Sequence, residues 1–216
     1  MVTGYTTYKR LIAQQHVSAF RIFIRFLTEI KPERILEIGT GGGGFILFLR
    51  DVLDSLNLKS SVVRTYDVVQ ENCDQVLRQN GVDIRIVNLF HETYSRLENP
   101  QEVVPFIQER GCTLVLCDGL NKIGEFRLLS QYIKAGDYIM AHDYVDSWER
   151  FEGEFLDKIW NWCEIEEKDI AECSQRNNLQ PYWKDRFEQV AWVCKRKSVL
   201  ATTTPLSSTA SLCLCE

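Results

Sequence analysis

A glycine-rich turn between a strand-like and a helix-like segment constrains this sequence more than any other feature. The apolar segment Arg34–Ile38 is typical of a strand, and Phe45–Leu56 carries apolar residues at helical spacing. At their junction, residues Glu37–Gly44 read Glu-Ile-Gly-Thr-Gly-Gly-Gly-Gly. Glycines allow a backbone to turn sharply and to approach a ligand closely, and the N-terminus of a helix offers free N–H groups. The pattern therefore predicts a ligand-binding strand–turn–helix unit.

Strand-like and helix-like segments alternate through five cycles of the chain. The strand-like segments are Arg34–Ile38, Ser61–Tyr66, Ile84–Leu89, Thr113–Cys117 and Tyr138–Ala141. The helix-like segments after Phe45–Leu56 are Glu71–Asn80, Glu102–Arg110 and Ile123–Ile133. This alternation predicts an α/β fold with a doubly wound, Rossmann-like parallel sheet that is covered by helices on both faces.

The two ends of the chain depart from this alternation. Apolar residues at helical spacing predict a helix up to Ile30, which Pro32 stops. After the fifth strand we expect a long helix over Glu149–Trp162, followed by strands at Cys163–Lys168 and Gln189–Lys195. Because no helix is expected between them, these two strands would form an antiparallel hairpin at the edge of a seven-stranded, mostly parallel sheet.

This one unit uses nearly all of the 216 residues. We expect a single domain over residues 1–197, in which about residues 1–30 form a helical cover. Residues 198–216 are rich in Ser and Thr and lack any periodicity, so they are predicted to be a disordered tail.

Composition excludes several other classes of protein. With 45% hydrophobic and 11% aromatic residues, the chain is too apolar to be disordered. A net charge of −5 disfavours nucleic acid as a partner, because a phosphate backbone selects basic surfaces. No apolar run approaches the roughly 18 residues of a membrane span, and the N-terminus does not resemble a secretory signal. The eight cysteines form no Cys-x-x-Cys pair, which favours reduced thiols and a cytoplasmic location.

Two acidic residues indicate which ligand the glycine-rich turn would bind. The spacing of Gly39, Gly41 and Gly44 also satisfies the dinucleotide pattern G-x-G-x-x-G, so NAD remains open as an alternative. Glu37 lies two positions before the first glycine, where its carboxylate would repel a pyrophosphate but suit an aminoacyl group that carries an ammonium and a sulfonium. Asp67 follows the second strand, from where a carboxylate accepts hydrogen bonds from ribose hydroxyls. The alternative for Asp67 is a turn cap.

With these residues the chain resembles a class I S-adenosylmethionine-dependent methyltransferase over roughly residues 9–197. The resemblance rests on Glu-x-Gly-x-Gly-x-Gly and on the acidic end of the second strand. Lys31-Pro32, followed by Glu37-Ile38-Gly39-Thr40 and Gly43-Gly44, is similar to the cephalosporin hydroxylase and rhamnosyl O-methyltransferase group. This implies S-adenosylmethionine as the cofactor, bound by Glu37, Gly39, Thr40, Gly41, Gly43, Asp67 and Asp118.

A second group of polar residues follows the fourth and fifth strands. Asp118 and Asp143 would meet at the same edge of a parallel sheet, where two carboxylates repel unless a cation or a proton lies between them. Oxygen-rich sites of this kind suit Mg²⁺, and the resembled group binds a divalent metal with an Asp and an acidic pair. Here the pair is His142-Asp143, and imidazole is a poorer ligand for a hard cation. A metal site of Asp118, His142 and Asp143 and a metal-free site therefore stay equal alternatives.

The resemblance implies methyl transfer to a hydroxyl group of a small molecule or sugar. Asp118, His142 and Asp143 would be the catalytic residues, which position the acceptor and, with His142 as a base or with Mg²⁺, deprotonate it. The group tends to carry a His three residues after the Asp, where this chain has Asn121. The alternatives are an NAD-dependent oxidoreductase and a methyltransferase-fold binding protein without catalysis. Homo-oligomerisation is left open.

A few further side chains are weaker candidates. Lys122 is expected to be solvated rather than bound to substrate, because lysines are rarely buried. Trp148, Trp160 and Trp162 could line an acceptor pocket, but packing is the more frequent role of such residues. His16 lies at the predicted first helix and is expected to be solvated.

Overall fold

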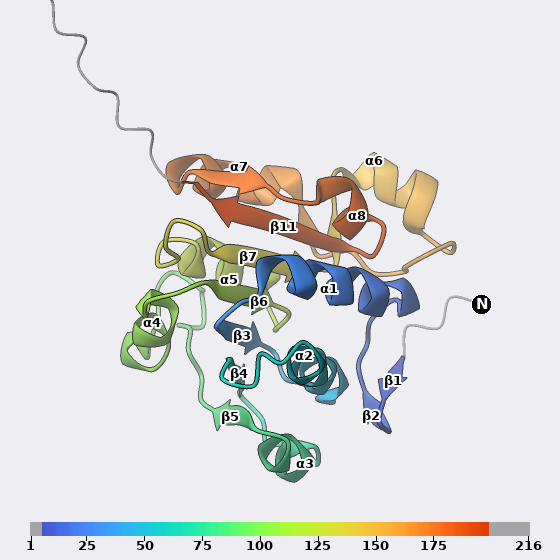
Figure 1. The fold of residues 1–216 in the computed structure, drawn as a ribbon. Coiled ribbons are helices and arrows are strands. Elements are labelled where there is room, and N and C mark those ends of the chain that lie inside the picture. The colour runs from blue at the N-terminus through green and yellow to red at the C-terminus, as the bar shows by residue number, and fades with distance from the viewer. Residues whose placement is uncertain (1–5, 199–216) are drawn as a thin grey trace, which may run out of the picture.

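The computed structural model describes residues 6–198, and these contain a seven-stranded mixed sheet in the order β10-β11-β7-β6-β3-β4-β5 (Figure 1). The strands are β3 (Arg34–Ile38), β4 (Val62–Asp67), β5 (Val82–Ile86), β6 (Thr113–Cys117), β7 (Tyr138–His142), β10 (Leu179–Pro181) and β11 (Trp192–Lys197). The five strands from β7 to β5 are parallel, whereas β11 and β10 are antiparallel to their neighbours. The predicted α/β fold, with a mostly parallel sheet and an antiparallel edge, is confirmed.

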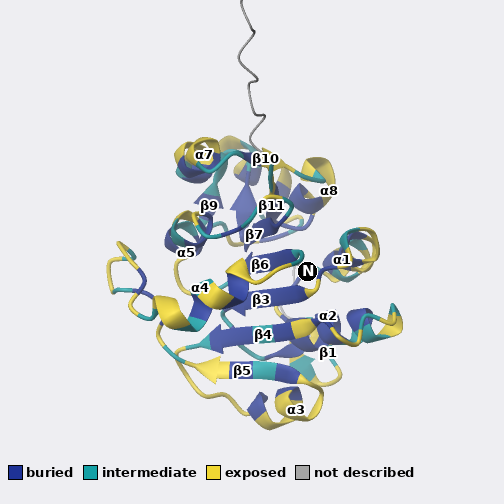
Figure 2. Cartoon of the chain, turned by 60° about the vertical axis from the view of Figure 1, so that its left-hand side comes forward, coloured by how far each residue is buried: buried dark blue, intermediate teal, exposed yellow. Residues whose placement is uncertain are grey.

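Helices cover both faces of the sheet, as Figure 2 shows. They are α1 (Val17–Ile30), α2 (Gly44–Ser55), α3 (Asp74–Gln79), α4 (Pro100–Gln108), α5 (Lys122–Leu129), α7 (Glu167–Arg176) and α8 (Lys184–Glu188). Alternate residues of each strand point to opposite faces, so Ile35 of β3 packs in a core with α1 and α2, while Leu36 packs in a second core with α4 and α5. The cores hold the parallel strands rigidly between two helical layers.

The predicted strand and helix boundaries agree closely with the structure in the parallel region. The strands at Arg34–Ile38 and Thr113–Cys117 have the predicted bounds. The strand predicted at Ile84–Leu89 is instead β5, Val82–Ile86. Its ladder ends where β4 ends, at the pair Asp67 and Ile86, so residues 87–89 leave the sheet and line a cavity instead.

The long helix predicted over Glu149–Trp162 is wrong. The chain forms only the short helix α6 (Trp148–Arg150) and one π-helical turn, η1 (Phe151–Phe155). Phe151 and Phe155 are buried together with Val145, and Gly153 between them is a poor helix former. Beyond this turn the chain is drawn away from a helical path because the side chain of Trp160 bonds to Asp143.

The strand predicted at Cys163–Lys168 does not belong to the main sheet, so this part of the prediction is also wrong. Ile165–Glu166 forms β9, which pairs only with β8 (Tyr144–Val145). The chain then enters α7 through a capping box of Glu166 and Asp169, a start signal that the sequence interpretation missed. The edge strand is β10, and α8 lies between it and β11, so the antiparallel edge is not a simple hairpin.

The N-terminal cover is helical only in α1. Before it, β1 (Thr7–Tyr8) and β2 (Leu11–Ile12) form a hairpin, so the predicted helical cover of about residues 1–30 is wrong for this part. Apart from Ser198, the tail predicted over residues 198–216 lies outside the described residues. The six cysteines within residues 6–198 form no disulfide with one another. Within the same residues no helix is long and apolar enough to cross a membrane.

Candidate functional site

The carboxyl ends of the parallel strands open onto a cavity of about 540 Å³. β3 lies between β4 and β6, so the chain leaves β3 towards one side of the sheet and returns to its other side for β6. Ligands of doubly wound folds bind at such a switch point, because the loops on either side diverge there. The cavity is lined by the turn after β3, by residues after β4, β5, β6 and β7, and by the segment 160–164.

The glycine-rich turn is held in the predicted place, directly after β3 (Figure 1). Gly39 has φ +89°, and a Cβ there would lie 2.6 Å from the carbonyl carbon of Asp118. Its N–H donates to the carbonyl of Tyr66 at 2.8 Å. Glycine is therefore required at this position by backbone conformation and by the close approach of the loop after β6.

Two of the other glycines make room for the N-terminal hairpin. A Cβ at Gly42 would lie 2.6 Å from Cβ of Ile12, and one at Gly44 would lie 2.6 Å from the carbonyl oxygen of Leu11. β2 therefore packs directly on the turn. A Cβ at Gly41, by contrast, would meet only Oε1 of Gln14, at 3.5 Å, so the backbone there remains open towards the cavity.

Glu37 is buried at the end of β3 and lines the cavity. Thr65 donates a hydrogen bond to its Oε2 at 2.7 Å, and the hydroxyls of Thr65 and Thr40 lie 2.8 Å apart. Burial raises the pKa of Glu37 well above its usual value, and the nearby Asp118 and Asp67 carboxylates add to this, although the Thr65 bond opposes it. A positively charged ligand group beside Glu37 would relieve this burial of negative charge.

Asp67 ends β4 and faces the cavity beside the glycine-rich turn. Its Oδ2 accepts from the N–H of Gly41 at 3.0 Å, and its Oδ1 accepts from the N–H of Val68 at 2.7 Å. The carboxylate thus caps the turn that follows β4, which was the alternative to a role in binding ribose. Because it also lines the cavity, the same oxygens are within reach of a ligand there.

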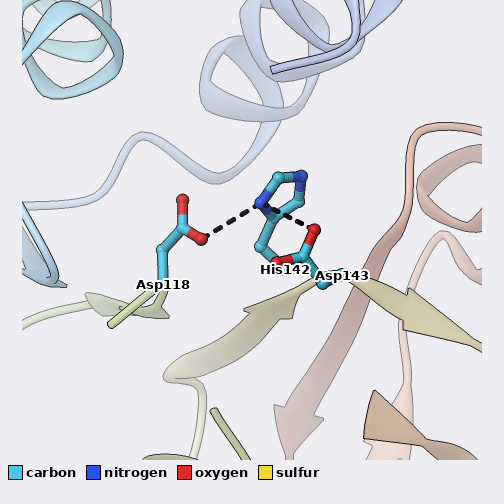
Figure 3. Close-up of side chains that lie close together, drawn as sticks. All are labelled: Asp118, His142 and Asp143. Carbon is cyan, nitrogen blue, oxygen red and sulfur yellow. Dashed lines mark hydrogen bonds and ion pairs between the residues drawn. The ribbon is translucent and has the colours of Figure 1, made fainter. Parts of the chain in front are cut away.

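The structure brings together the three residues that were predicted to bind metal and the acceptor (Figure 3). One donor atom from each of Asp118, His142 and Asp143 lies within 4.8 Å of the others. Nδ1 of His142 lies 3.0 Å from Oδ1 of Asp118 and 3.6 Å from Oδ1 of Asp143. The three side chains come together because the adjacent parallel strands β6 and β7 end at the same level of the sheet.

His142 is buried between two indole rings. It stacks on Trp192, with ring centroids 4.8 Å apart, and its centroid lies 5.2 Å from that of Trp160. Burial lowers the pKa of His142, but the Asp118 and Asp143 carboxylates outweigh this and raise it above the usual value. Its Nε2 is buried and has no hydrogen-bond partner within residues 6–198. The ring therefore presents Nδ1 to the carboxylates.

Asp143 adopts φ +55° directly after β7, and its carbonyl oxygen and both carboxylate oxygens have partners. Nε1 of Trp160 donates to its Oδ1 at 2.7 Å, and the N–H of Glu164 donates to its carbonyl oxygen at 2.9 Å. Trp160 thus both packs and forms the cavity wall. Trp162 also lines the cavity and is 61% exposed, as does Leu120, which is 80% exposed.

Lys122 contradicts its predicted solvated state, because it is only 6% exposed. Its Nζ lies 3.0 Å from Oδ2 of Asp143 and donates to Oε2 of Glu164 at 2.9 Å and to the carbonyl oxygen of Gly119 at 3.1 Å. Oδ1 of Asp118 is 3.9 Å away. Burial lowers the pKa of Lys122, but the surrounding carboxylates outweigh this and raise it, so the side chain is an ammonium.

Sequence reasoning missed Gln15, which is 1% exposed. Its Nε2 donates to Oδ2 of Asp118 at 3.1 Å, and its Oε1 accepts from Nε1 of Trp192 at 2.8 Å. No local pattern signals this role, since both partners are more than 100 residues away in the chain. The neighbouring His16 only caps α1, where it accepts from the N–H of Ser18 at 3.3 Å.

Comparison with solved structures identifies the fold of this site. An apo structure of CmcI, a cephalosporin hydroxylase, has a TM-score of 0.59 at 12% identity, over 90% of this chain and 77% of that one. The CmcI structure described as "Mg-SAM" has a TM-score of 0.58 at 14% identity, over 88% and 76%. An O-methyltransferase family protein from Burkholderia thailandensis has a TM-score of 0.51 at 7% identity, over 83% of this chain and 55% of that one. Neither protein-family models nor curated proteins give a match.

The chain has the fold of S-adenosylmethionine-dependent methyltransferases. The cavity residues fit that cofactor: an open backbone at Gly41, a buried carboxyl group at Glu37 whose ionised form a cationic ligand group would stabilise, and the Asp67 carboxylate. Magnesium does not fit in the same way. Both oxygens of Asp143 already have partners, in Trp160 and the Lys122 ammonium, and both oxygens of Asp118 have partners in His142 and Gln15.

Proposed function

We propose that this protein transfers a methyl group from S-adenosylmethionine to a hydroxyl oxygen of a small molecule or sugar. The observation that carries the proposal is the cavity itself. It is lined by the glycine-rich turn, by the acidic residues Glu37 and Asp67, and by the Asp118–His142 pair. A cofactor bound at the turn and an acceptor bound beside His142 would meet inside this one cavity, and holding two reactants in line is a large part of the catalysis of such a transfer.

Glu37 and the glycine-rich turn would bind the methionine part of the cofactor. The carboxylate of Glu37 is buried, so an ammonium group beside it would gain a partner in a medium that screens charge poorly. Asp67 would accept hydrogen bonds from the ribose. The apolar side chains Val68, Leu89 and Phe90 also line the cavity and offer a surface on which a flat base can pack.

The acceptor would bind between the Asp118–His142 pair and the outer cavity wall. Leu120 and Trp162 form an exposed apolar rim, which suits a small acceptor with an apolar or ring-shaped body. When bound, the cofactor supplies a methyl group that its sulfonium already activates. In its neutral form, His142 would take up the proton of the acceptor hydroxyl at Nε2, the ring nitrogen that has no partner within residues 6–198, while Asp118 holds Nδ1.

The same geometry disfavours an NAD-dependent oxidoreductase more than it disfavours a methyltransferase-fold binding protein without catalysis. A dinucleotide would bring its pyrophosphate to the glycine-rich turn, beside the buried carboxyl group of Glu37, where its negative charge would raise the pKa of that group further instead of relieving it. A binding protein without catalysis would keep the cofactor end of the cavity intact. We expect a small acceptor rather than nucleic acid, because the net charge is −5.

Calorimetry of the purified full chain with S-adenosylmethionine, S-adenosylhomocysteine and NAD tests the cofactor. We expect binding of the first two, and an at least tenfold weaker affinity in Asp67→Ala, about 1.4 kcal/mol. Asp185→Ala, at an exposed position on α8, is the matched control. Binding of NAD alone would contradict the proposal. Mass-spectrometric detection of methyl transfer to a panel of hydroxylated acceptors then separates an enzyme from a binding protein.

A further inference from the structure

We propose that the ammonium of Lys122 is the resident cation of this site and makes a divalent metal unnecessary. From the sequence, Mg²⁺ is one of two alternatives for this site. The effect of Lys122 on catalysis rests on the proposed methyl transfer, but the identity of the cation can be established without it.

The first support is the engagement of the carboxylate oxygens. Oδ1 of Asp118 lies 3.0 Å from Nδ1 of His142, and its Oδ2 accepts from Gln15 at 3.1 Å. Oδ1 of Asp143 accepts from Trp160 at 2.7 Å, and its Oδ2 lies 3.0 Å from Nζ of Lys122. Magnesium demands short oxygen contacts in near-octahedral geometry. It would have to displace protein donors from both carboxylates, whereas the ammonium already has its contacts.

The second support is the fixed position of the ammonium. Nζ of Lys122 contacts three oxygen atoms at 2.9–3.1 Å, from Asp143, Glu164 and the carbonyl of Gly119. An ammonium has three N–H donors, so these contacts satisfy it. Lys122 begins α5 and is 6% exposed, and Gly119 lies in the loop that leads into this helix. The lysine is therefore held by the fold and is not a mobile surface side chain.

The third support is the charge of the surroundings. Asp118, Asp143 and Glu164 would place three negative charges around one point, and such a group is stable only with a cation among them. Lys122 supplies that cation from within the chain. A divalent ion on Asp118 and Asp143 would lie close to Nζ, where two positive charges repel.

The residue before Asp143 acts in the same direction. His142 offers an imidazole, which is a poorer ligand for a hard cation than a carboxylate, and its Nδ1 lies 3.0 Å from Oδ1 of Asp118. Beside the Lys122 ammonium, this lowers the attraction of the site for a divalent metal.

In this arrangement Lys122 is a positioning residue. Through Asp143 it holds the end of β7, and through Glu164 it holds the segment that walls the cavity. It also lies 3.9 Å from Asp118, whose other contacts are His142 and Gln15. One ammonium thus ties the loop after β6, the end of β7 and the cavity wall together.

Titration of the full chain with Mn²⁺, a paramagnetic substitute for Mg²⁺, tests the inference. The chain has three histidines, so broadening of the His142 ring signals in NMR spectra reports binding at this site. We expect no saturable broadening in the wild type below about 1 mM Mn²⁺. In Lys122→Met, which frees Asp143 and Glu164, we expect a site at least about tenfold tighter. Lys59→Met, at an exposed position, should behave as the wild type.

Saturable broadening of His142 in the wild type overturns the inference, and so does a folded Lys122→Met variant that gains no metal site. If that variant does not fold, the wild-type titration alone decides. The affinity of the wild type for S-adenosylmethionine is measured with and without EDTA. If the wild type binds no S-adenosylmethionine under either condition, the proposed function is refuted. The Mn²⁺ titration still shows whether the site binds a divalent metal.

Discussion

The indole N–H of Trp192 donates to Oε1 of Gln15 at 2.8 Å, across 177 residues of sequence. The other end of the same amide donates to Asp118, so Gln15 joins β11 and the N-terminal segment to the acidic centre. Gln15 is buried and sits just before α1. The segment that covers the cavity is therefore also part of the support of the site.

Replacing Gln15 should damage both stability and the site. In Gln15→Leu the buried indole N–H of Trp192 loses its acceptor, and an unsatisfied buried donor costs about 1–3 kcal/mol. We expect a fall of this size in the free energy of unfolding in denaturant titrations, together with slower methyl transfer. Gln101→Ala, at an exposed position of α4, is the control and should change neither quantity.

Two glycines with the same backbone conformation allow a matched test of the turn. Gly39 has φ +89° and faces the carbonyl group of Asp118, whereas Gly136 has φ +91° and a Cβ added there would meet no atom within 4 Å. Gly136→Ala should cost only the left-handed conformation, roughly 1–2 kcal/mol. Gly39→Ala should cost clearly more, because the clash with backbone is added. Equal losses in thermal unfolding of the two variants would contradict this account.

Trp160 and Trp162 allow a test of the indole bond to Asp143. Trp160→Phe keeps a ring but removes the donor to the buried Oδ1, which should lower the free energy of unfolding by about 1–3 kcal/mol and slow methyl transfer. Trp162 is 61% exposed, so Trp162→Phe should leave stability nearly unchanged. If both variants lose the same stability, the Trp160 bond is not what supports Asp143.

The stability should depend on pH through His142. Burial lowers its pKa, but the Asp118 and Asp143 carboxylates outweigh this and raise the pKa above the ordinary 6.5. The folded state therefore holds the proton more tightly than the unfolded state. The resulting stabilisation is fully present below about pH 6.5 and is lost as the pH rises through the folded-state pKa. Denaturant unfolding measured between pH 6 and 9 should show this decline.

Two buried acids, Glu37 and Glu125, titrate with the same sign, so a variant is needed to assign the effect. Burial raises the pKa of Glu37 well above its usual value. Burial raises the pKa of Glu125 from 4.5 to about 7, although backbone N–H donors in the loop before α5 oppose the shift. Its contribution is likewise lost as the pH rises from about 4.5 through 7. The difference between the wild type and His142→Asn isolates His142, and it should shrink as the pH rises. A difference that does not change with pH would contradict the raised pKa.

Local patterns in the sequence predict the parallel part of the fold well. The apolar runs at Arg34–Ile38 and Thr113–Cys117 are buried on both faces and have the predicted bounds. Beyond Asp143 the strand predicted at Gln189–Lys195 is confirmed as β11, but the same patterns fail for the segment between Asp143 and α7. There the path of the chain depends on Trp160 reaching Asp143 and on the capping box of Glu166 and Asp169, not on the spacing of apolar residues.

Sequence patterns alone predict that a glycine-rich turn follows the first parallel strand and that Asp118 and Asp143 meet at one edge of the sheet. Both follow from short-range patterns and from the geometry of parallel strands. The three-dimensional arrangement is needed to show which group compensates the negative charge of these carboxylates. Lys122 has no local reason to be buried, and it becomes an internal cation because Asp143 and Glu164, 21 and 42 residues later, fold around it. The state of a buried charge depends on its partners in space.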